Sequence, residues 1–226
     1  MTDPKIDQLS GEGQIFWLPA KQYVTHHVKV WLVQPVERQI FSKAALLSSI
    51  LRRGTCRYPN QRRLVAALEE LWGADLHTQV NRVGSYHLTS FYLNLADGRF
   101  LPAAGETLLT DGLQLLQELI TAPYLLDDRF PAEVFHQEKQ RLLAILESSR
   151  NNRSSLAAQQ MKALVYGDTA YGVPRYGTKE DLQAVTNEEL CDYYHQLLQN
   201  SRLIVGLCGD GVEHVTTEQA EKMFSW

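Results

Sequence analysis

The spacing of apolar residues alternates between a period of two and a helical period, and the order of these changes limits the possible folds. Strand-like segments occur in pairs, at Gln14–Pro19 with Val28–Pro35 and at Leu76–Val83 with His87–Leu95, and a last buried strand is expected at Leu203–Leu207. Helical segments lie between and after the pairs, so no βαβ repeat is present. We therefore predict an α+β domain in which two hairpins and the last strand form one mainly antiparallel sheet, with helices packed on one face.

The histidines in these strands do not form a metal site. His26 and His27 are adjacent, so their side chains face opposite sides of a strand. A turn at Val83-Gly84 would set Val80 opposite His87, which leaves His77 and His87 out of register with each other.

One helix, within residues 41–55, combines two different faces. Ile40, Ala44, Leu47 and Leu51 form an apolar stripe that a core would cover, and Arg52, Arg53 and Gly54 end the helix. A second stripe has only small side chains, those of Ala45, Ser48 and Ser49. This spacing is the one on which a helix can present two zinc-binding histidines and a catalytic carboxylate, but an alanine and two neutral hydroxyls cannot do that chemistry. The stripe either permits close packing or marks an inactive site.

Composition excludes several classes of protein. The 226 residues include 22 basic and 26 acidic side chains, a formal net charge of −4, so no basic surface for nucleic acid is expected. Three widely spaced cysteines, Cys56, Cys191 and Cys208, suggest neither a disulfide framework nor a zinc ribbon, and a cytoplasmic location is expected. No segment approaches the roughly 20 apolar residues that span a bilayer. No cofactor motif is recognised, and the glycines from Gly206 to Gly211 are interpreted as ending a strand.

Other segments carry local signals. Residues 1–12 are a polar leader, and Asn60 and Thr186 are expected to cap helices. The helix after Ser154 has one apolar face, formed by Ala157, Met161, Leu164 and Val165. It is followed by a long loop rich in Gly, Pro and Tyr, residues 166–177.

Glu138 interrupts an apolar stripe that also contains Phe135, Leu142 and Ile145. Two interpretations remain open. The carboxylate either lies at the margin of the stripe, paired with Lys139 or Arg141, or belongs to a former polar site that faces the small stripe of residues 45–49.

At these positions the chain resembles the insulinase/pitrilysin family of zinc metallopeptidases. Four segments match its motifs in order, at Leu51–Thr55, Leu71–Leu76, Tyr171–Thr178 and Leu203–Asp210. The resemblance implies a LuxS/processing-peptidase-like metallopeptidase domain over residues 13–226, the N-terminal one of two homologous domains, with the second expected outside this chain.

The resemblance also assigns the positions of the family's zinc site. The two ligand histidines correspond to Ala45 and Ser49 and the catalytic glutamate to Ser48. Downstream, Glu138 matches a family glutamate, and the third ligand corresponds to Ile145. These positions are vestigial, so the resemblance implies no catalytic residue, no metal and no cofactor. The chain looks most like the non-catalytic bacterial members labelled YfmF-like.

The implied function is that of a non-catalytic partner subunit or a peptide-binding module. The expected partner is a catalytic insulinase-family subunit, with extended peptide as a second ligand and neither nucleic acid nor membrane involved. The candidate peptide-binding edge is the strand Leu76–Val83, on which Thr78, Val80 and Arg82 are expected to be solvent-accessible unless another strand or subunit covers them.

Two other functions remain open at this stage. One is a peptide-binding domain that acts alone. The other is an enzyme of another class that uses Tyr171, Tyr176, His195 or Glu138 as acid or base, although these residues have no interpretable spacing.

Overall fold

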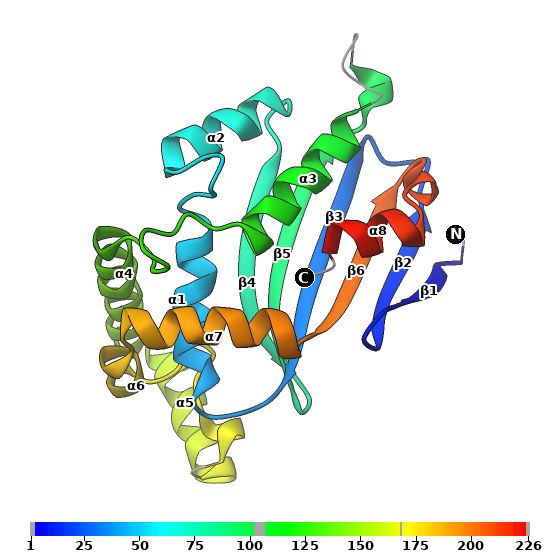
Figure 1. Cartoon of the computed structure of the whole chain (residues 1–226). Helices are drawn as coiled ribbons and strands as arrows, with labels where there is room; N and C mark the ends of the chain where they lie inside the picture. The colour runs from blue at the N-terminus through cyan, green and yellow to red at the C-terminus, as the bar shows by residue number, and fades with distance from the viewer. Residues whose placement is uncertain (1–2, 102–106, 168, 225–226) are drawn as a thin grey trace.

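A six-stranded mixed sheet forms the centre of the molecule (Figure 1). The computed structural model describes residues 3–101, 107–167 and 169–224. The strand order is β1-β2-β6-β3-β5-β4, and every neighbouring pair is antiparallel except β2 with β6. The strands are β1 (Lys5–Leu9), β2 (Gly13–Pro19), β3 (Thr25–Pro35), β4 (Asp75–Val83), β5 (Tyr86–Ala96) and β6 (Arg202–Gly209).

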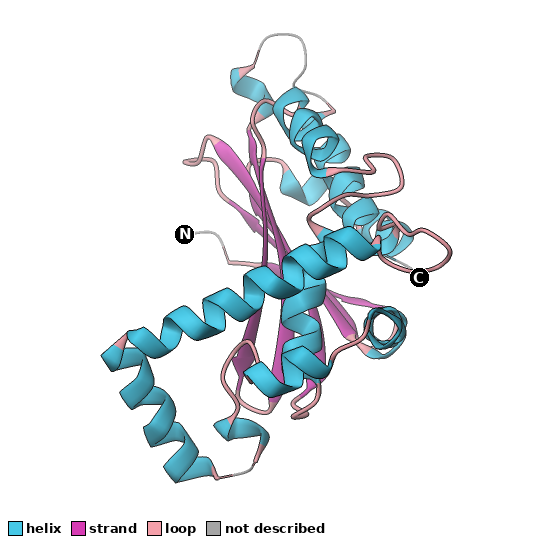
Figure 2. Ribbon diagram, turned by 90° about the vertical axis from the view of Figure 1, so that its left-hand side faces the viewer, coloured by secondary structure: helices cyan, strands magenta, loops and turns pink. Residues whose placement is uncertain are grey.

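Helices cover one face of this sheet, as Figures 1 and 2 show. The helices are α1 (Ile40–Leu51), α2 (Gln61–Glu70), α3 (Leu108–Thr121), α4 (Ala132–Asn151), α5 (Arg153–Tyr166), α6 (Lys179–Ala184), α7 (Asn187–Asn200) and α8 (Thr217–Phe224), of which α5 lies away from the sheet. In β3, Val28, Val30 and Leu32 are buried, while the residues between them are partly exposed. This alternation confirms the predicted α+β architecture with helices on one face. None of the helices in the described ranges is both long and apolar enough to cross a bilayer.

The predicted first hairpin is wrong. β2 and β3 do not pair, because β6 lies between them, parallel to β2 and antiparallel to β3. The polar leader contains β1, which forms the hairpin with β2 instead. Alternation predicts that a segment is a strand but not which strand it pairs with. The almost continuously apolar β6 is buried best between two neighbours, and β1 then closes the edge of the sheet.

The second hairpin exists, but its predicted register is wrong. Val80 lies opposite Thr89, and Arg82 lies opposite His87. The connection contains only Gly84 and Ser85, since Val83 pairs with Tyr86, and Gly84 adopts the positive φ (56°) that such a tight loop requires. His77 faces Tyr92, so the two histidines of this hairpin are not opposite each other.

Local helix signals are more reliable than the pairing signals. The side chain of Asn60 accepts a hydrogen bond from the Arg63 amide, and Thr186 forms the predicted capping box with Glu189. The short helix α6 was not predicted. Its N-cap is Thr178, whose hydroxyl accepts a hydrogen bond from the amide of Asp181. It lies just after the long loop, of which Asp168 is outside the described residues.

Helix α5 is present, but its apolar face is not covered. Met161, Leu164 and Val165 are 61%, 87% and 67% exposed. The figures show α5 returning from the far end of α4, away from the sheet. The described residues therefore bury the apolar faces of the other long helices but leave this one open to solvent.

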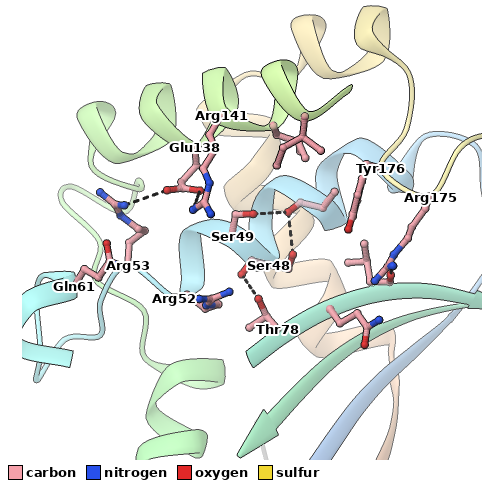
Figure 3. A pocket seen from close by; sticks show the side chains of 15 residues that line it. Ser48, Ser49, Arg52, Arg53, Gln61, Thr78, Glu138, Arg141, Arg175 and Tyr176 are labelled. Atoms are coloured by element: carbon pink, nitrogen blue, oxygen red, sulfur yellow. Dashed lines mark hydrogen bonds and ion pairs between the residues drawn. The ribbon is translucent and has the colours of Figure 1, made fainter. Parts of the chain in front are cut away.

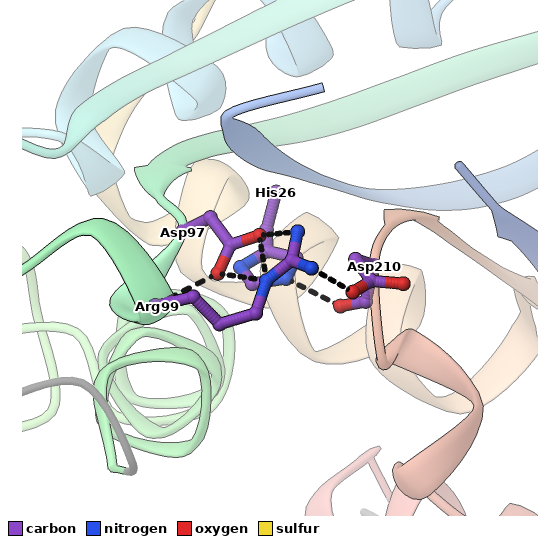
Figure 4. A network of polar contacts seen from close by, with 4 residues as sticks. All are labelled: His26, Asp97, Arg99 and Asp210. Atoms are coloured by element: carbon purple, nitrogen blue, oxygen red, sulfur yellow. Dashed lines mark hydrogen bonds and ion pairs between the residues drawn. The ribbon is translucent and has the colours of Figure 1, made fainter. Parts of the chain in front are cut away.

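A polar network joins the ends of three strands (Figure 4). Arg99 pairs with Asp97, just after β5, at 2.6 Å, and also with Asp210, just after β6. His26 of β3 donates a hydrogen bond to the backbone oxygen of Asp210 at 2.7 Å. Burial raises the pKa of Asp97, but the hydrogen bonds from Arg99 outweigh it and hold that pKa below its usual value.

Gly206 shows why one strand position must lack a side chain. The glycines Gly209 and Gly211 end β6 with positive φ, as predicted, but Gly206 lies inside the strand. A Cβ atom there would lie 2.4 Å from Phe16 Cζ and 3.0 Å from the Trp31 ring. The two rings are 5.7 Å apart and lie over the backbone of Gly206, so the glycine allows them to pack together.

We expect Gly206→Ala to lower the free energy of unfolding by about 1–3 kcal/mol, because the methyl group overpacks this contact. Urea unfolding of the wild type and the variant measures the loss. Adding Phe16→Leu should recover part of it, since the ring that the methyl meets is then smaller. Equal stability of the wild type and Gly206→Ala would contradict the packing argument.

His87 makes the fold sensitive to acid. Its side chain is 1% exposed, its ring lies edge-on to Phe41 at 5.1 Å, and neither ring nitrogen has a hydrogen-bond partner among the described residues. Burial lowers the pKa of His87 from 6.5 to about 4. Between these two pH values the unfolded chain binds a proton that the folded chain does not, so stability falls as the pH falls.

At pH 5 this residue should therefore make the protein about 2 kcal/mol less stable than at neutral pH. The matched control is His87→Phe, which keeps an aromatic ring and cannot be protonated. We expect the stability difference between wild type and variant to change by this amount between pH 7.5 and pH 5. Parallel stability profiles would show that His87 is not buried in a neutral form.

Candidate functional site

A cavity of about 180 Å³ lies between α1, β4, α4 and the two loop residues Arg175 and Tyr176 (Figure 3). All five vestigial positions line it: Ala45, Ser48, Ser49, Glu138 and Ile145. Two residues of the candidate edge, Thr78 and Val80, line the same cavity. The fold thus brings together lining residues that are up to 131 positions apart in the sequence, from Ala45 to Tyr176.

The serine and threonine hydroxyl groups of this cavity are engaged by the backbone. Ser48 Oγ and Ser49 Oγ both donate to the carbonyl oxygen of Ala45, at 2.9 and 3.3 Å, and Thr78 Oγ1 donates to that of Ser48 at 2.8 Å. No histidine lines the cavity to activate a serine. The small side chains allow α1 to pack against both β4 and α4. The stripe of Ala45, Ser48 and Ser49 therefore permits close packing and also lines a cavity.

Glu138 is the one acidic residue that lines the cavity, and it is 2% exposed. Its carboxylate lies 3.2 Å from Arg53 and 3.7 Å from Arg141. The pairing with Arg141 was predicted, whereas Lys139 instead donates to the backbone oxygens of Gln183 and Val185. Both earlier interpretations of Glu138 hold in part, because the carboxylate is ion-paired and also faces the small stripe.

The cavity does not suit the zinc ion of the family that the chain resembles. Ala45 and Ile145 have no donor atom, and the two serines offer neutral hydroxyls. The remaining carboxylate is engaged by two guanidinium groups. Across the described ranges, no group of three or more His, Cys, Asp and Glu side chains is arranged to hold a metal ion.

β4 is an edge strand, as predicted, but its side chains are less accessible than expected. Val80 is 1% exposed, so the prediction that it is solvent-accessible is wrong, while Thr78 and Arg82 are half-buried. These three residues alternate with residues of the open face, and their side chains point to the helical side of the sheet. An edge strand exposes its backbone, but its side chains are still covered wherever a helix lies over that face.

The outward backbone groups of β4 differ along the strand. In a two-residue hairpin the closing pair, here Val83 and Tyr86, is hydrogen-bonded, so Thr78, Val80 and Arg82 direct their backbone groups away from β5. The Val80 oxygen accepts a hydrogen bond from Arg175 Nε at 2.6 Å. The side chain of Arg82 donates through Nη1 to the Tyr171 oxygen at 2.6 Å, so the segment at Tyr171 lies beside this end of the strand. Arg175 thus occupies the outward oxygen of Val80, whereas the outward backbone groups of Thr78 have no such partner among the described residues.

The residues considered for another type of enzyme are not assembled into a site. Tyr176 lines the cavity with Glu138, but the hydroxyl of Tyr171 shares a hydrogen bond with Ser85 at 2.9 Å. His195 is exposed on α7, beside the ring of Tyr194. No nucleophile, base and orienting group meet in this set.

Four arginines line the cavity, and the sequence did not predict that they lie close together. Arg52 and Arg53 follow α1, Arg141 lies on α4 and Arg175 lies in the loop before α6. In the sequence, the first two were interpreted only as cations at a helix C-terminus. Their proximity to Arg141 and Arg175 depends on the tertiary fold, and no local signal indicates it.

We expect the untagged protein to contain no stoichiometric zinc, because the cavity lacks ligands, and elemental analysis measures this. The matched variant combines Ala45→His, Ser49→His and Ile145→Glu, which places three donors at the assigned positions. This variant should gain zinc. Stoichiometric zinc in the wild type would contradict the assignment of an inactive site, and failure of the variant to gain zinc would contradict the assigned positions.

Comparison with known proteins places this cavity in context. No family model matches the chain. It is 26% identical over 193 residues to the "probable inactive metalloprotease YmfF" of Bacillus subtilis, a match that covers 85% of this chain and 45% of that protein.

Two solved structures have the same fold. A conserved protein from Enterococcus faecalis is 25% identical, with a TM-score of 0.93 over 98% of this chain and 52% of that one. An inactive domain of peptidase M16 from Pseudomonas fluorescens is 16% identical, with a TM-score of 0.77 over 99% of this chain and 50% of that one.

The chain therefore spans about half the length of the proteins that it matches. Three observations indicate the same kind of protein: the similarity to YmfF, the shared fold, and the absence of ligand side chains at positions 45, 49 and 145. The chain is a non-catalytic homologue of the M16, or insulinase-like, metallopeptidases.

Proposed function

We propose that this chain is a non-catalytic unit that pairs with an insulinase-family zinc peptidase and holds extended peptide along β4. The observation that supports peptide binding is the open edge at Thr78, beside the cavity. Among the described residues outside β5, none makes a hydrogen bond to the outward backbone groups of Thr78. Such groups gain hydrogen bonds when an extended peptide adds to the sheet.

A partner is supported by the surface of α5. Met161, Leu164 and Val165 are neighbours at helical spacing, and all three side chains are exposed. Exposed apolar side chains that gather on one helix face are typical of a surface that another protein covers. In the family that the chain resembles, catalytic chains often work with inactive homologous chains.

A stand-alone peptide-binding domain is the second candidate, and it differs only in having no partner. Size-exclusion chromatography of the chain with an insulinase-family peptidase separates the two functions. A stable complex supports the pairing, and independent elution supports the lone domain.

We further propose a cytoplasmic location, because three unpaired cysteines, Cys56, Cys191 and Cys208, suit a reducing compartment.

Proline at Thr78 tests the edge directly. We expect Thr78→Pro to weaken the binding of a capped octapeptide of alternating valine and serine about fivefold, because one outward amide is lost. An edge strand tolerates proline where the amide faces away from its neighbour. Fluorescence anisotropy of the labelled peptide measures the affinity.

The matched control is Thr78→Val. It removes the hydrogen bond from the Thr78 hydroxyl to Ser48 but keeps the amide. Binding by Thr78→Val should therefore remain close to that of the wild type. Circular dichroism checks that both variants are folded. Equal affinity of all three proteins would mean that this edge does not bind peptide.

A further inference from the structure

The cavity beside β4 is strongly cationic in a protein that is acidic as a whole. Four guanidinium groups, those of Arg52, Arg53, Arg141 and Arg175, line it together with one carboxylate, that of Glu138. Three positive charges are therefore in excess around about 180 Å³, while the whole chain has a formal net charge of −4. Charges of one sign that line a concave site raise the local concentration of ligands with the opposite charge.

The four arginines fall into two pairs. Arg53 and Arg141 neutralise Glu138, and Arg53 also donates to the side chain of Gln137 at 2.9 Å. Arg52 and Arg175 have no carboxylate partner among the described residues. No carboxylate among the described residues therefore neutralises the positive charge of these two side chains.

Arg175 is held in a position from which it can bind an anion. Its Nε donates to the Val80 oxygen at 2.6 Å, and its guanidinium group lies over the ring of Tyr176, 5.1 Å from the centroid. These contacts leave its terminal N–H groups available as donors. The hydroxyl of Tyr176, which also lines the cavity, has no hydrogen-bond partner among the described residues. The serine hydroxyls already donate to the backbone, so the available donors are those of the arginines and the tyrosine.

The cavity opens on the side chains of the edge strand. Thr78 and Val80 line it, and their side chains point to the helical face of the sheet. In an antiparallel pair, residues directly opposite each other place their side chains on the same face. A peptide residue opposite Thr78 would therefore direct its side chain toward the cationic cavity. Figure 3 shows Thr78 together with the arginines that line this cavity.

We propose that the cavity binds a carboxylate group of the peptide held on β4, either an acidic side chain or the C-terminal carboxylate. The proposal rests on the proposed function, since the peptide must first add to this edge. Arg52 and Arg175 are the residues that bind the carboxylate, and Tyr176 donates an additional hydrogen bond. Planar guanidinium groups suit this ligand because each can form two parallel hydrogen bonds to a carboxylate.

Two capped octapeptides of alternating valine and serine, with either glutamate or glutamine at one central position, test the side-chain source. We expect the wild type to bind the glutamate peptide about tenfold more tightly at low salt, because the hydrogen bonds are charge-assisted. The difference should shrink at high salt. The glutamine peptide with a free C-terminal carboxylate, compared with its amide, tests the chain-end source in the same way.

Four variants locate the effect. Arg52→Gln and Arg175→Gln should each reduce the preference for glutamate to about threefold or less. The control, Arg202→Gln, removes an exposed charge on β6 that does not line this cavity and should keep the preference. Glu138→Gln should increase affinity for the glutamate peptide, because it releases Arg53 and Arg141.

The outcomes separate this proposal from the function on which it rests. If the peptides bind and Thr78→Pro weakens them, but acidic and neutral peptides bind equally, the carboxylate proposal is wrong and the edge proposal stands. A preference that persists in Arg52→Gln and in Arg175→Gln would also overturn it. If no peptide binds, the proposed function itself fails, and the carboxylate proposal fails with it.

Discussion

Helix α1 is buried on two sides at once, and the cavity and the sheet edge both depend on this packing. Ala44, Leu47 and Leu51 contribute to the core and are at most 1% exposed. On another side, the small side chains of Ala45 and Ser48 allow β4 and α4 to approach. Larger residues there would fill the cavity or force these elements apart. The same stripe therefore fixes the packing and leaves the space in which a ligand can lie.

The arginines around this space also solve an electrostatic problem. A carboxylate as deeply buried as that of Glu138 is costly unless a cation and hydrogen bonds compensate it. The resemblance places this glutamate beside a metal site, and no metal ligands remain at positions 45, 49 and 145. Arg53, which follows α1, and Arg141, on α4, supply the positive charge instead. The ion pairs tie the end of α1 to α4 across the cavity.

The sequence predicted the elements of this fold better than their partners. Helix ends such as Asn60 and Thr186 depend on atoms only a few residues away, so local patterns are sufficient. Strand order depends on contacts between distant segments, and for that reason the position of β6 between β2 and β3 was missed. The register of the second hairpin was wrong because its loop is one residue further along than predicted.

The sequence likewise predicted some features of the candidate site and missed others. Helical spacing predicted that Ala45, Ser48 and Ser49 share one face of α1, whereas the assignment of positions 138 and 145 to the same site came from the resemblance to the family. The burial of Val80 was not predicted, because it depends on the helices that cover that face of the sheet. The two unpaired arginines were also missed. Arg52 and Arg175 are 123 positions apart in the sequence, and only the packed structure brings them to one cavity.

The self-covered part of β4 has a consequence for how much peptide this edge can hold. A long exposed edge promotes association with other strands, and proteins limit this risk by covering or shortening the edge. Here Arg175 occupies the outward oxygen of Val80, and the side chain of Arg82 donates to the Tyr171 carbonyl oxygen, which holds that segment beside the strand. The edge left open near Thr78 is short, so backbone hydrogen bonds alone would give weak binding. A side-chain contact in the adjacent cavity then contributes a larger share of the affinity, and selectivity at this edge depends on the charge that surrounds that cavity.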